Sequence, residues 1–598
     1  MFKNLKRINL LLTKKERKKL YGLSVLNIFS GFMDMFGVAS IAPFLAVVSN
    51  EKIMNENKYV LKIKETFELS NQEIIIYFAL FSMFLLILNQ STRLLNGWYQ
   101  THCTQKIFLS FYLKTFKFFV DQPYSYHIQT NSNEILEKLS MRVNAAVAGV
   151  ITPVFRIMGY LFTCIFLFIL LVIANPTVTL LLLAFTGLFY FIVFSKLKIK
   201  IENYGKFAPE YSRKTYKLVD QSLRSIKDIK MKNNASFYKK LIESLANKFA
   251  DNQINKDFFG LFPRSLLEVL AYIFAFSTAI YFVTFSSDFS ASFILLGIYA
   301  FSLQKILPAA QGIYHQLTEI KFYRPSLETI YDELLKATKL SQTTSNSNSI
   351  NHFNFSNSIQ IHNVKFQYRA SDKKVLDIKQ IDLKAANFIG ITGKTGSGKT
   401  TFIDLILGLL DPSSGKILID GKELDKNLGD NWRSKIGYVP QFSFMADDTI
   451  TNNIALGQAE SEINLEKIKK VSQIANISDF IENDLPNKYE TVIGENGVRL
   501  SGGQIQRLSI ARSLYKDPEV IVLDEATNSL DALTEKNIVE SLLKNYKNKT
   551  IIMIAHRLSV LKKCDKILLF NKGEIVDAGT YDFLVKNNLI FRDMLNIN

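Results

Sequence analysis

The sequence predicts two parts in one chain: an all-α region with six membrane-crossing helices, followed by an α/β domain. Hydrophobic residues make up 48% of the 598 residues, and the long runs with few charges lie in the first half of the chain. In the second half, short runs rich in β-branched residues alternate with helical patterns, which is typical of a mostly parallel sheet covered by helices. The predicted strands of this sheet are SIQIHNVKFQY, FIGITG, KIGYVPQ, VIVLDEA and TIIMIAH. A chain of this length exceeds one hydrophobic core, so more than one domain is expected.

Six apolar runs in the first half are candidate membrane crossings. Most of them reach about 18 residues, the length at which a helix crosses a bilayer. They lie at about residues 21–49, 74–91, 157–174, 177–195, 269–287 and 289–304. Six crossings place both termini on the same side of the membrane.

The charge distribution indicates which side that is. The formal net charge is +18, and the excess lies almost entirely in the first 354 residues, with basic segments at 92–148 and 196–264. Because positively charged loops remain in the cytosol, both termini are predicted to be cytosolic. A basic excess that accompanies apolar spans favours a membrane protein over a nucleic-acid partner. The three cysteines have no metal-binding or disulfide spacing.

The segments outside the membrane also have predicted structures. The two basic segments are expected to project into the cytosol as paired helices that close at tips 121–130 and 230–238. The basic N-terminus predicts an amphipathic helix on the inner membrane surface, not a cleaved signal peptide. A helix is expected to continue after Pro308, and the Ser/Asn-rich run predicts a flexible linker. The predicted domains are therefore 1–340 (membrane), 341–358 (linker) and 359–598 (α/β).

The stretch GKTGSGKT follows the strand pattern NFIGIT and precedes the helical pattern TTFIDLILGLL. This complete G-x-x-x-x-G-K-T sequence is typical of a phosphate-binding loop, whose backbone N–H groups surround phosphate oxygens and whose lysine reaches the outer phosphates. The hydroxyl that follows the lysine, on Thr400, ligates Mg²⁺. The predicted ATP-binding residues here are Gly393, Lys394, Thr395, Gly396, Ser397, Gly398, Lys399, Thr400 and Thr401.

Catalytic candidates stand at the ends of other predicted strands. VIVLDE places Asp524 to hold Mg²⁺ and Glu525 to polarise the attacking water. His556, after the strand TIIMIA, can contact the γ-phosphate, and Gln441 in YVPQ can contact Mg²⁺ and the water. Tyr368 in VKFQYRA can stack on adenine. Taken alone, the last three would more often be structural residues.

A second glycine-rich loop, LSGGQIQR at residues 500–507, contains no lysine and precedes a helix. Ser501 and the N–H groups of Gly502 and Gly503 would form an anion site at that helix terminus. Each of the two loops is positioned by its own geometry, so both cannot reach one phosphate within a domain. We therefore expect two domains to face each other, each lending this loop to the other's ATP.

Together these motifs, which cover residues 359–598, resemble an ABC transporter, with a P-loop ATPase domain. The resemblance adds Gln504, in the signature loop, and Asp531, in an SLD segment, to the nucleotide-binding residues. Six spans ahead of one such domain are similar to an exporter half-molecule. This implies ATP hydrolysis coupled to transport, a homodimer (alternatively a heterodimer with a related half-transporter), a bacterial inner-membrane location, and coupling helices at the two tips, with Glu495 near them.

Within this family, the membrane half is most similar to bacterial lipid-linked oligosaccharide flippases. The resemblance rests on FMDMFGVASIAPF with Asp34, an amphipathic outer segment beginning NKYVLK, and PRSLLE. It implies membrane-lipid contact and movement of a lipid-linked glycan to the outer leaflet by alternating access. The alternative cargo is another lipid, a peptide or hydrophobic drugs. An ATP-gated channel is a third hypothesis, which intact Glu525 and His556 disfavour.

Three arginines in or beside the spans are candidate ligands for the negatively charged pyrophosphate of such a lipid: Arg93, Arg156 and Arg264. An unpaired cation there is costly unless it faces a wet cavity or a partner. In the alternative interpretation, Arg93 and Arg264 reach the inner headgroups, and Arg156 pairs with Asp34 or Glu268 as a structural contact.

Overall fold

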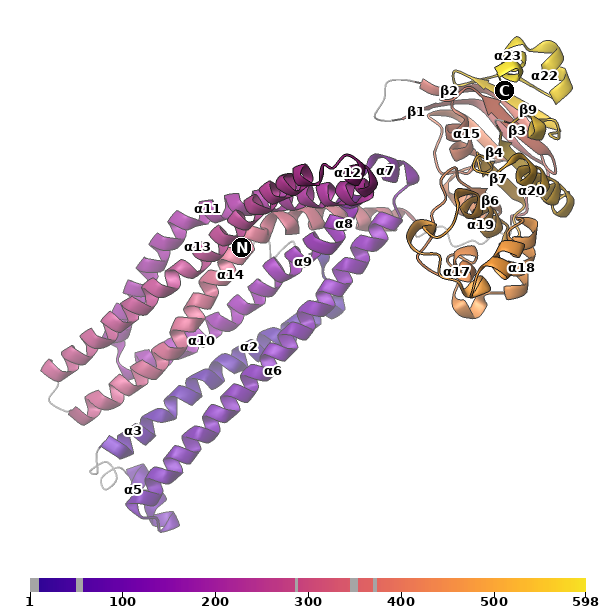
Figure 1. Ribbon diagram of the computed structural model, residues 1–598. Coiled ribbons are helices and arrows are strands. Elements are labelled where there is room, and N and C mark those ends of the chain that lie inside the picture. The colour runs from indigo at the N-terminus through magenta and orange to yellow at the C-terminus, as the bar shows by residue number, and fades with distance from the viewer. Residues whose placement is uncertain are drawn as a thin grey trace. The chain divides into compact units, whose positions relative to one another are not determined.

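The computed structural model describes residues 10–49, 58–285, 289–344, 353–368, 374–555 and 557–597. The chain forms two compact units (Figure 1). Unit 1 contains Met1–Gln122 and Tyr126–Thr344, and unit 2 contains Ser345–Asn598 together with Pro123–Ser125.

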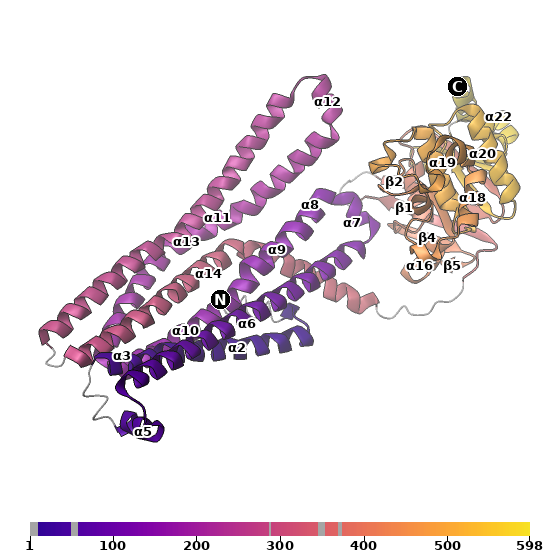
Figure 2. The same ribbon diagram turned by 60° about the horizontal axis from the view of Figure 1, so that its bottom comes forward.

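In its described residues, unit 1 is helical, and its long helices lie side by side (Figures 1 and 2). The long helices are α2 (Lys14–Ala39), α6 (Asn71–Val120), α10 (Thr152–Ala174), α11 (Pro176–Arg224), α13 (Ala235–Phe285) and α14 (Phe289–Thr344). The shorter ones are α3 (Ile41–Ser49), α5 (Lys58–Phe67), α7 (Tyr124–Gln129), α8 (Ser132–Glu137), α9 (Val143–Ala146) and α12 (Ile226–Met231), with π-helical turns η1 (Lys138–Arg142) and η2 (Val147–Ile151).

Several helix boundaries follow directly from local sequence. Thr13 and Glu16 form a capping box at the start of α2, and Ser70 and Glu73 form another at the start of α6. Asn175 caps α11, and Pro176 occupies its first turn, where a missing N–H costs nothing. The short helices α7 and α12 lie within or beside the predicted tips 121–130 and 230–238.

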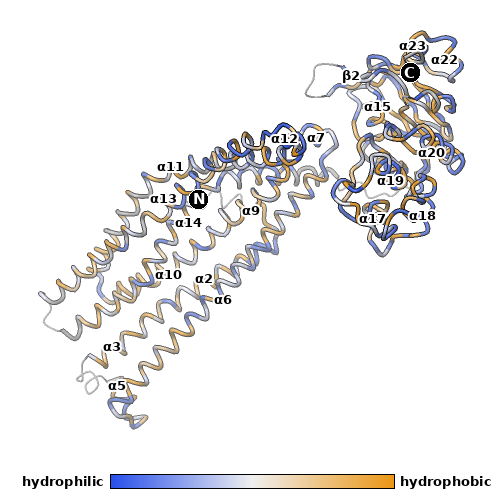
Figure 3. The backbone as a smooth tube through the Cα atoms, in the orientation of Figure 1, coloured by the Kyte–Doolittle hydropathy of each residue, from blue (hydrophilic) through white to orange (hydrophobic). Residues whose placement is uncertain are grey.

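Four helical stretches of the described chain are long and apolar enough to cross a membrane: Lys14–Ser49, Asn71–Val120, Ser132–Ala174 and Ser292–Lys336. A shorter apolar helix covers Glu268–Ile280. Each of the four stretches contains all or most of one predicted span. The predicted span 177–195 lies in α11, and residues 269–285 of the predicted span 269–287 lie in α13, whereas residues 286 and 287 are outside the described residues; both spans remain predictions. Figure 3 shows hydrophobic residues prevailing along these helices and hydrophilic residues around α7 and α12.

The ends of unit 1 are partly described. Pro308 does not end a helix, because α14 continues to Thr344 with both Pro308 and Pro325 inside it. Residues 1–9 of the predicted N-terminal amphipathic helix, and residues 345–352 of the predicted linker, lie outside the described residues.

Unit 2 contains two sheets. The six-stranded sheet has the order β10-β9-β3-β8-β7-β6, and all of its pairs are parallel except β10–β9. Its strands are β3 (Phe388–Gly393), β6 (Ile436–Val439), β7 (Val520–Asp524), β8 (Thr550–Ile554), β9 (Lys566–Asn571) and β10 (Glu574–Gly579). The four-stranded sheet has the order β2-β1-β4-β5, with β1 (Ser358–Gln367), β2 (Lys374–Lys384), β4 (Ser414–Ile419) and β5 (Lys422–Glu423).

This second sheet corrects the sequence prediction that β1 belongs to the mostly parallel sheet. All pairs in the four-stranded sheet are antiparallel. The prediction was wrong for β1 because a single strand pattern does not contain its pairing partners, and β2 and β4 have mixed burial that weakens their pattern.

Helices and short turns complete unit 2. The helices are α15 (Lys399–Ile406), α16 (Lys426–Ser434), α17 (Ile450–Ile454), α18 (Leu465–Ile474), α19 (Gly502–Leu514), α20 (Ala532–Asn545), α21 (Leu558–Leu561), α22 (Tyr581–Asn587) and α23 (Leu589–Ile597). The short turns are η3 (Glu460–Glu462), η4 (Phe480–Asp484), η5 (Lys488–Glu490) and η6 (Glu495–Gly497).

The central strands of the parallel sheet position the site. Every residue of β3, β7 and β8 is buried, which explains their nearly continuous apolar sequences. Because these strands are parallel neighbours, their carboxyl ends meet at one edge of the sheet, where open α/β sheets bind ligands. Gly393 and Asp524 are the last residues of two of these strands.

Candidate functional site

The loop between β3 and α15 has the backbone shape of a phosphate cradle. Gly393 and Gly398 have φ of 151° and 98°, which L side chains rarely adopt. A Cβ at Gly393 would lie 2.2 Å from the carbonyl oxygen of Phe570, and one at Gly398 would lie 2.6 Å from Leu376. Both glycines are therefore required by conformation and by space.

Lys399 is buried at the start of α15, with 6% of its surface exposed. Its Nζ donates to the carbonyl oxygens of Gly393 (2.9 Å) and Lys394 (3.2 Å). Burial lowers the pKa of Lys399, while the charges of Glu525 and Asp524 oppose that shift. A phosphate would supply the counter-charge that this ammonium lacks within the loop.

The rest of the loop is open to a ligand. The Ser397 hydroxyl is buried and has no hydrogen-bond partner among the described residues. Exposed side chains and backbone surround it, at Lys394, Thr395, Gly396 and Thr400. Thr401 is buried, and its Oγ1 lies 3.1 Å from the hydroxyl of Tyr368. Tyr368, which was predicted to stack on adenine, also packs edge-on against Phe366.

Asp524 is a buried carboxylate with an unused oxygen. Its Oδ2 accepts a hydrogen bond from the Tyr438 hydroxyl (3.4 Å), whereas its Oδ1 has no partner among the described residues. Burial, and then the charge of Glu525, raise the pKa of Asp524 to about 6. An unpartnered buried carboxylate oxygen is a ligand that Mg²⁺ prefers, so Asp524 and the Thr400 hydroxyl fit the predicted metal site.

No cluster of three or more His, Cys, Asp or Glu that could hold a metal ion by itself occurs in the described part of the chain. A metal here would thus be shared with nucleotide phosphates, as is usual for Mg²⁺.

Glu525 lies beside Asp524 in a strained conformation, with φ of 49°. Its Oε2 accepts hydrogen bonds from Gln441 Nε2 (2.7 Å) and Asn528 Nδ2 (2.9 Å). Gln441 reaches it because β6 and β7 are parallel neighbours, so the residues after them meet at one edge. The structure therefore brings the predicted catalytic residues Glu525 and Gln441 together. Two amide donors hold this carboxylate in one orientation.

Sequence reasoning missed Asn528, although it follows Glu525 by three residues in the same turn. His556 lies outside the described residues, so its predicted role remains a prediction. Its neighbour Arg557 donates to Glu535 (3.1 Å) and to the Leu530 carbonyl (2.9 Å), which attaches this loop to the start of α20.

The second glycine-rich loop begins α19. Ser501 and Gln504 form a capping box: Gln504 N–H donates to Ser501 Oγ, and Ser501 N–H donates to Gln504 Oε1. A Cβ at Gly502 would lie 3.5 Å from Ser529, and one at Gly503 would lie 3.3 Å from Leu530. The loop therefore lies against the SLD segment.

Asp531 ends that segment and caps α20, accepting from the N–H groups of Leu533 (3.1 Å) and Thr534 (2.9 Å). Hydrogen bonds from Thr534 hold its pKa below the usual range. Among the described residues, no hydrogen bond or ion pair joins Ser501–Gln504 to the phosphate loop, and the use of this loop by a second copy stays a prediction.

A second buried aspartate lies close to this site. Asp404, in α15, is 7% exposed, and burial together with the charge of Asp524 raises its pKa to about 6. Because this pKa lies above the ordinary value of 3.8, the contribution to stability is full below about pH 4 and is lost as pH rises through about 6.

We expect Asp404→Asn to stabilise the nucleotide-free protein at about pH 8 by up to about 3 kcal/mol, because the substitution removes one of two buried like charges. The melting temperature of the full chain should then fall less between about pH 5 and about pH 8 than it does in the unaltered protein. Asp411→Asn, at an exposed aspartate, is the control. An equal fall in the two variants would contradict the assignment.

The structure describes the side chains of two of the three candidate substrate arginines. Arg93 in α6 and Arg156 in α10 are exposed, and neither has an ion-pair partner within the described part of the chain. The side chain of Arg264 lies outside the described residues. Arg93 and Arg156 thus remain candidates for an anionic group.

The alternative pairing of Arg156 with Asp34 is wrong. Asp34 is fully buried, and its Oδ1 accepts from Lys305 Nζ at 2.7 Å. Asn89 (3.2 Å) and Thr163 (2.9 Å) also donate to this carboxylate. Sequence reasoning missed Lys305 because the predicted sixth span ended one residue before it. A lysine three residues before Pro308, in line with that span, was the available signal.

Comparisons with known proteins match both units to ABC transporter families. A family described as ABC transporter matches residues 376–528, and one described as ABC transporter transmembrane region matches residues 20–304. An export ATP-binding/permease protein of Rickettsia typhi is 33% identical over 361 residues, which are 58% of this chain and 61% of that protein. An ATP-dependent lipid A-core flippase of Pseudomonas aeruginosa is 38% identical over 261 residues, 44% of this chain and 42% of that protein.

The fold of the whole chain has a solved counterpart. The structure of a bacterial Atm1-family ABC exporter with ATP bound superimposes with a TM-score of 0.75 at 20% identity, covering 97% of this chain and 98% of that one. The matched segments of the two curated relatives span only about two- to three-fifths of their lengths.

Proposed function

Since the chain belongs to the ABC transporter family, with transmembrane and ATP-binding regions fused in one polypeptide, we propose that it couples ATP hydrolysis to export across a membrane. The observation that carries this proposal is the cluster of Lys399, Asp524, Glu525 and Gln441 at one edge of the parallel sheet. It combines a phosphate cradle with an oriented carboxylate, which are the parts that phosphoryl transfer to water requires.

The chain's own residues have separate roles in this reaction. The loop amides and Lys399 bind the phosphates, and Thr400 and Asp524 would hold Mg²⁺, which neutralises charge on the phosphate oxygens. Glu525, held by Gln441 and Asn528, is oriented to accept a proton from the attacking water. His556 is proposed to contact the γ-phosphate. Positioning and charge neutralisation provide most of the rate enhancement in this class of reaction.

The signature loop Ser501–Gln504 serves the ATP of a second copy in this proposal. Its support is the backbone N–H groups at the start of α19, which could bind an anion, and the lack of any hydrogen bond from this loop to the chain's own phosphate loop among the described residues. A homodimer with two complete sites follows, and a heterodimer with a related half-transporter is the alternative. Both termini are proposed to be cytosolic, with the protein in a bacterial inner membrane.

The proposed cargo is a lipid-linked oligosaccharide, moved from the inner to the outer leaflet. Arg93 and Arg156 support it, because both are exposed without an ion-pair partner in the described part of the chain, and a cation beside a span requires a wet cavity or an anion. The match to lipid A-core flippases supports a lipid cargo of this general kind.

The test is ATP hydrolysis by the purified protein in liposomes with and without lipid-linked oligosaccharide, with Glu525→Gln as the inactive control. We expect the glycan lipid to stimulate ATP hydrolysis. We also expect Arg93→Ala and Arg156→Ala, combined in one chain, to abolish this stimulation. Stimulation by hydrophobic drugs or free lipid, but not by the glycan lipid, would contradict this cargo and select the alternative exporter of drugs, peptides or other lipids.

A further inference from the structure

Helix α14 is 56 residues long and contains two prolines, Pro308 and Pro325. Each proline lacks an N–H and removes one hydrogen bond of the helix, so these are the two positions at which α14 bends most readily. The prolines divide α14 into an outer segment (289–307), a middle segment (309–324) and an inner segment (326–344). The helix changes direction between its ends in Figures 1 and 2.

The outer segment is held to α2 by a buried ion pair. Lys305 Nζ lies 2.7 Å from Asp34 Oδ1, and the two side chains are 15% and 1% exposed. Asn89 and Thr163 complete the shell of donors around Asp34, so α6 and α10 take part in the same contact. Four helices thus meet at one carboxylate.

The middle segment is held to a different helix, α13. Lys256 lies 3.0 Å from Glu319, with the two side chains 10% and 16% exposed. The same ammonium lies over the rings of Phe322 and Tyr323. Gln311, near the start of the segment, donates to Glu268 of α13 at 3.5 Å.

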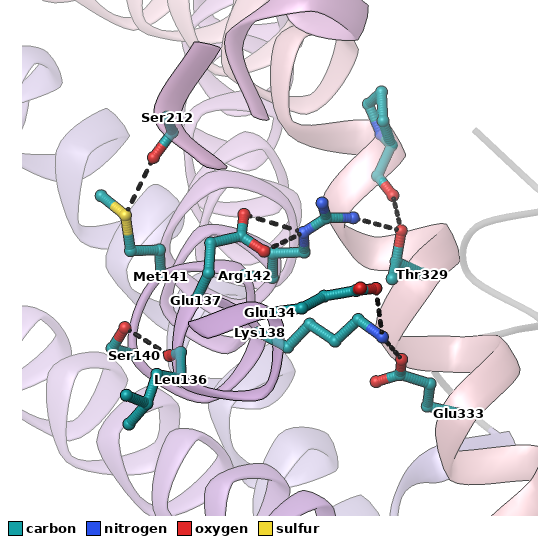
Figure 4. Close-up of polar contacts among 11 residues, drawn as sticks. Glu134, Leu136, Glu137, Lys138, Ser140, Met141, Arg142, Ser212, Thr329 and Glu333 are labelled. Carbon is teal, nitrogen blue, oxygen red and sulfur yellow. Dashed lines mark hydrogen bonds and ion pairs between the residues drawn. The ribbon is translucent and has the colours of Figure 1, made fainter. Parts of the chain in front are cut away.

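The inner segment is held to the π-helical turn η1 (Figure 4). Lys138 lies 2.7 Å from Glu333, with both side chains 11% exposed, and 3.1 Å from Glu134. One turn away, Arg142 donates to Thr329 (3.0 Å) while its Nε lies 2.9 Å from Glu137. π-Helical turns within α-helices often mark functional positions.

We propose that α14 moves as three segments, which are connected by bends at its two prolines and held by three ion pairs. In this proposal the pairs Asp34–Lys305, Lys256–Glu319 and Lys138–Glu333 are positioning residues that couple ATP hydrolysis to movement of the membrane helices. When the membrane helices move, each segment moves with the element to which its own ion pair attaches it. Differences in movement between neighbouring segments are accommodated by bending of α14 at the prolines. The inner segment is the part of α14 that precedes the ATPase unit in the sequence. This inference rests on the proposed transport function.

Ion pairs suit this role better than apolar contacts. Burying two charges costs desolvation free energy, so a well-packed apolar pair would often stabilise the fold as well or better. A charge pair instead specifies one partner and one register, because the remaining charge is left buried and unpaired in any other arrangement. Three such pairs on one helix, each to a different element, therefore specify which neighbour each segment must follow.

The test uses the full-length protein with spin labels at Leu113→Cys in α6 and Phe237→Cys in α13, two exposed positions. The three native cysteines are buried. The distance distribution between the labels is measured without nucleotide and after trapping with ATP and vanadate. The variants are Lys256→Met, Lys138→Met and the charge exchanges Lys256→Glu/Glu319→Lys and Lys138→Glu/Glu333→Lys. ATP hydrolysis is measured in parallel.

We expect the single variants to keep ATP hydrolysis but lose the nucleotide-dependent shift in distance, and the charge exchanges to recover it. Pro308→Ala and Pro325→Ala keep all three ion pairs, and each should reduce the shift. Glu328→Gln removes a partly buried pair with Arg324 within α14 itself, which joins α14 to no other helix, so this variant is the matched control and should leave the shift unchanged.

Two results would overturn the proposal. Single variants that keep the full distance shift would show that the pairs do not couple the units. Loss of the shift that charge exchange does not recover would show that the pairs only stabilise the fold. Neither measurement depends on the cargo, so an error in the proposed substrate would leave this test intact.

Discussion

Glu525→Gln should lower ATP hydrolysis by about a hundredfold or more, while ATP binding remains. The amide cannot accept the proton of the attacking water, yet it keeps the size of the side chain and can still bond to Asn528 or Gln441. The phosphate loop and Lys399 are untouched, so affinity for nucleotide should change little. Steady-state phosphate release measures the first effect, and equilibrium binding of a fluorescent ATP analogue measures the second.

Glu466→Gln is the matched control for this variant, because Glu466 is an exposed carboxylate of α18 whose ion pair is with Lys469 of the same helix. It should hydrolyse ATP at the unaltered rate. A Glu525→Gln protein that kept more than a tenth of the activity would contradict the role of Glu525 as the proton acceptor.

Ser501→Arg should abolish most hydrolysis, by about a hundredfold, and leave binding of ATP to the chain's own phosphate loop largely intact. The substitution removes the side-chain cap of α19, which costs about 1 kcal/mol and does not unfold a domain. It also places a long side chain where the N–H groups of Gly502 and Gly503 would face a phosphate. The readouts are again phosphate release and equilibrium binding.

Ser461→Arg, at an exposed serine of η3, controls for the added charge and bulk. Normal hydrolysis by Ser501→Arg, or loss of ATP binding together with hydrolysis, would show that this loop is not a second phosphate site used in trans.

Much of the ATPase unit could be predicted from the sequence because its site residues follow strands in fixed order. The strand endings at Gly393 and Asp524 and the cap at Ser501 are local features, and each is visible in a few residues of sequence. The contact of Gln441 with Glu525 follows from one feature, the parallel pairing of β6 with β7. Asn528 was missed because no pattern distinguishes an amide donor from an ordinary turn residue.

The membrane unit was less predictable because its decisive contacts join residues far apart in the chain. Asp34 and Lys305 are separated by 271 positions, so the sequence showed a buried acid without its partner. The predicted span ended before Lys305 because a charge was taken as the edge of an apolar run. Inside a helix bundle, a paired charge can lie well within the span. The antiparallel strand β1 was misplaced for the same reason, because pairing is not a local property.

The central claim is that each of two copies completes the other's catalytic site, and mixing two inactive variants tests it most directly. In a dimer of one Lys399→Ala chain and one Ser501→Arg chain, reciprocal sites would leave one site with both defects and one site with none. Mixing equal amounts should therefore restore roughly a quarter of the unaltered hydrolysis rate, since about half of the dimers are mixed. Each variant alone should stay inactive. If the mixture is as inactive as its components, although co-purification of two affinity tags shows that mixed dimers have formed, the account is contradicted.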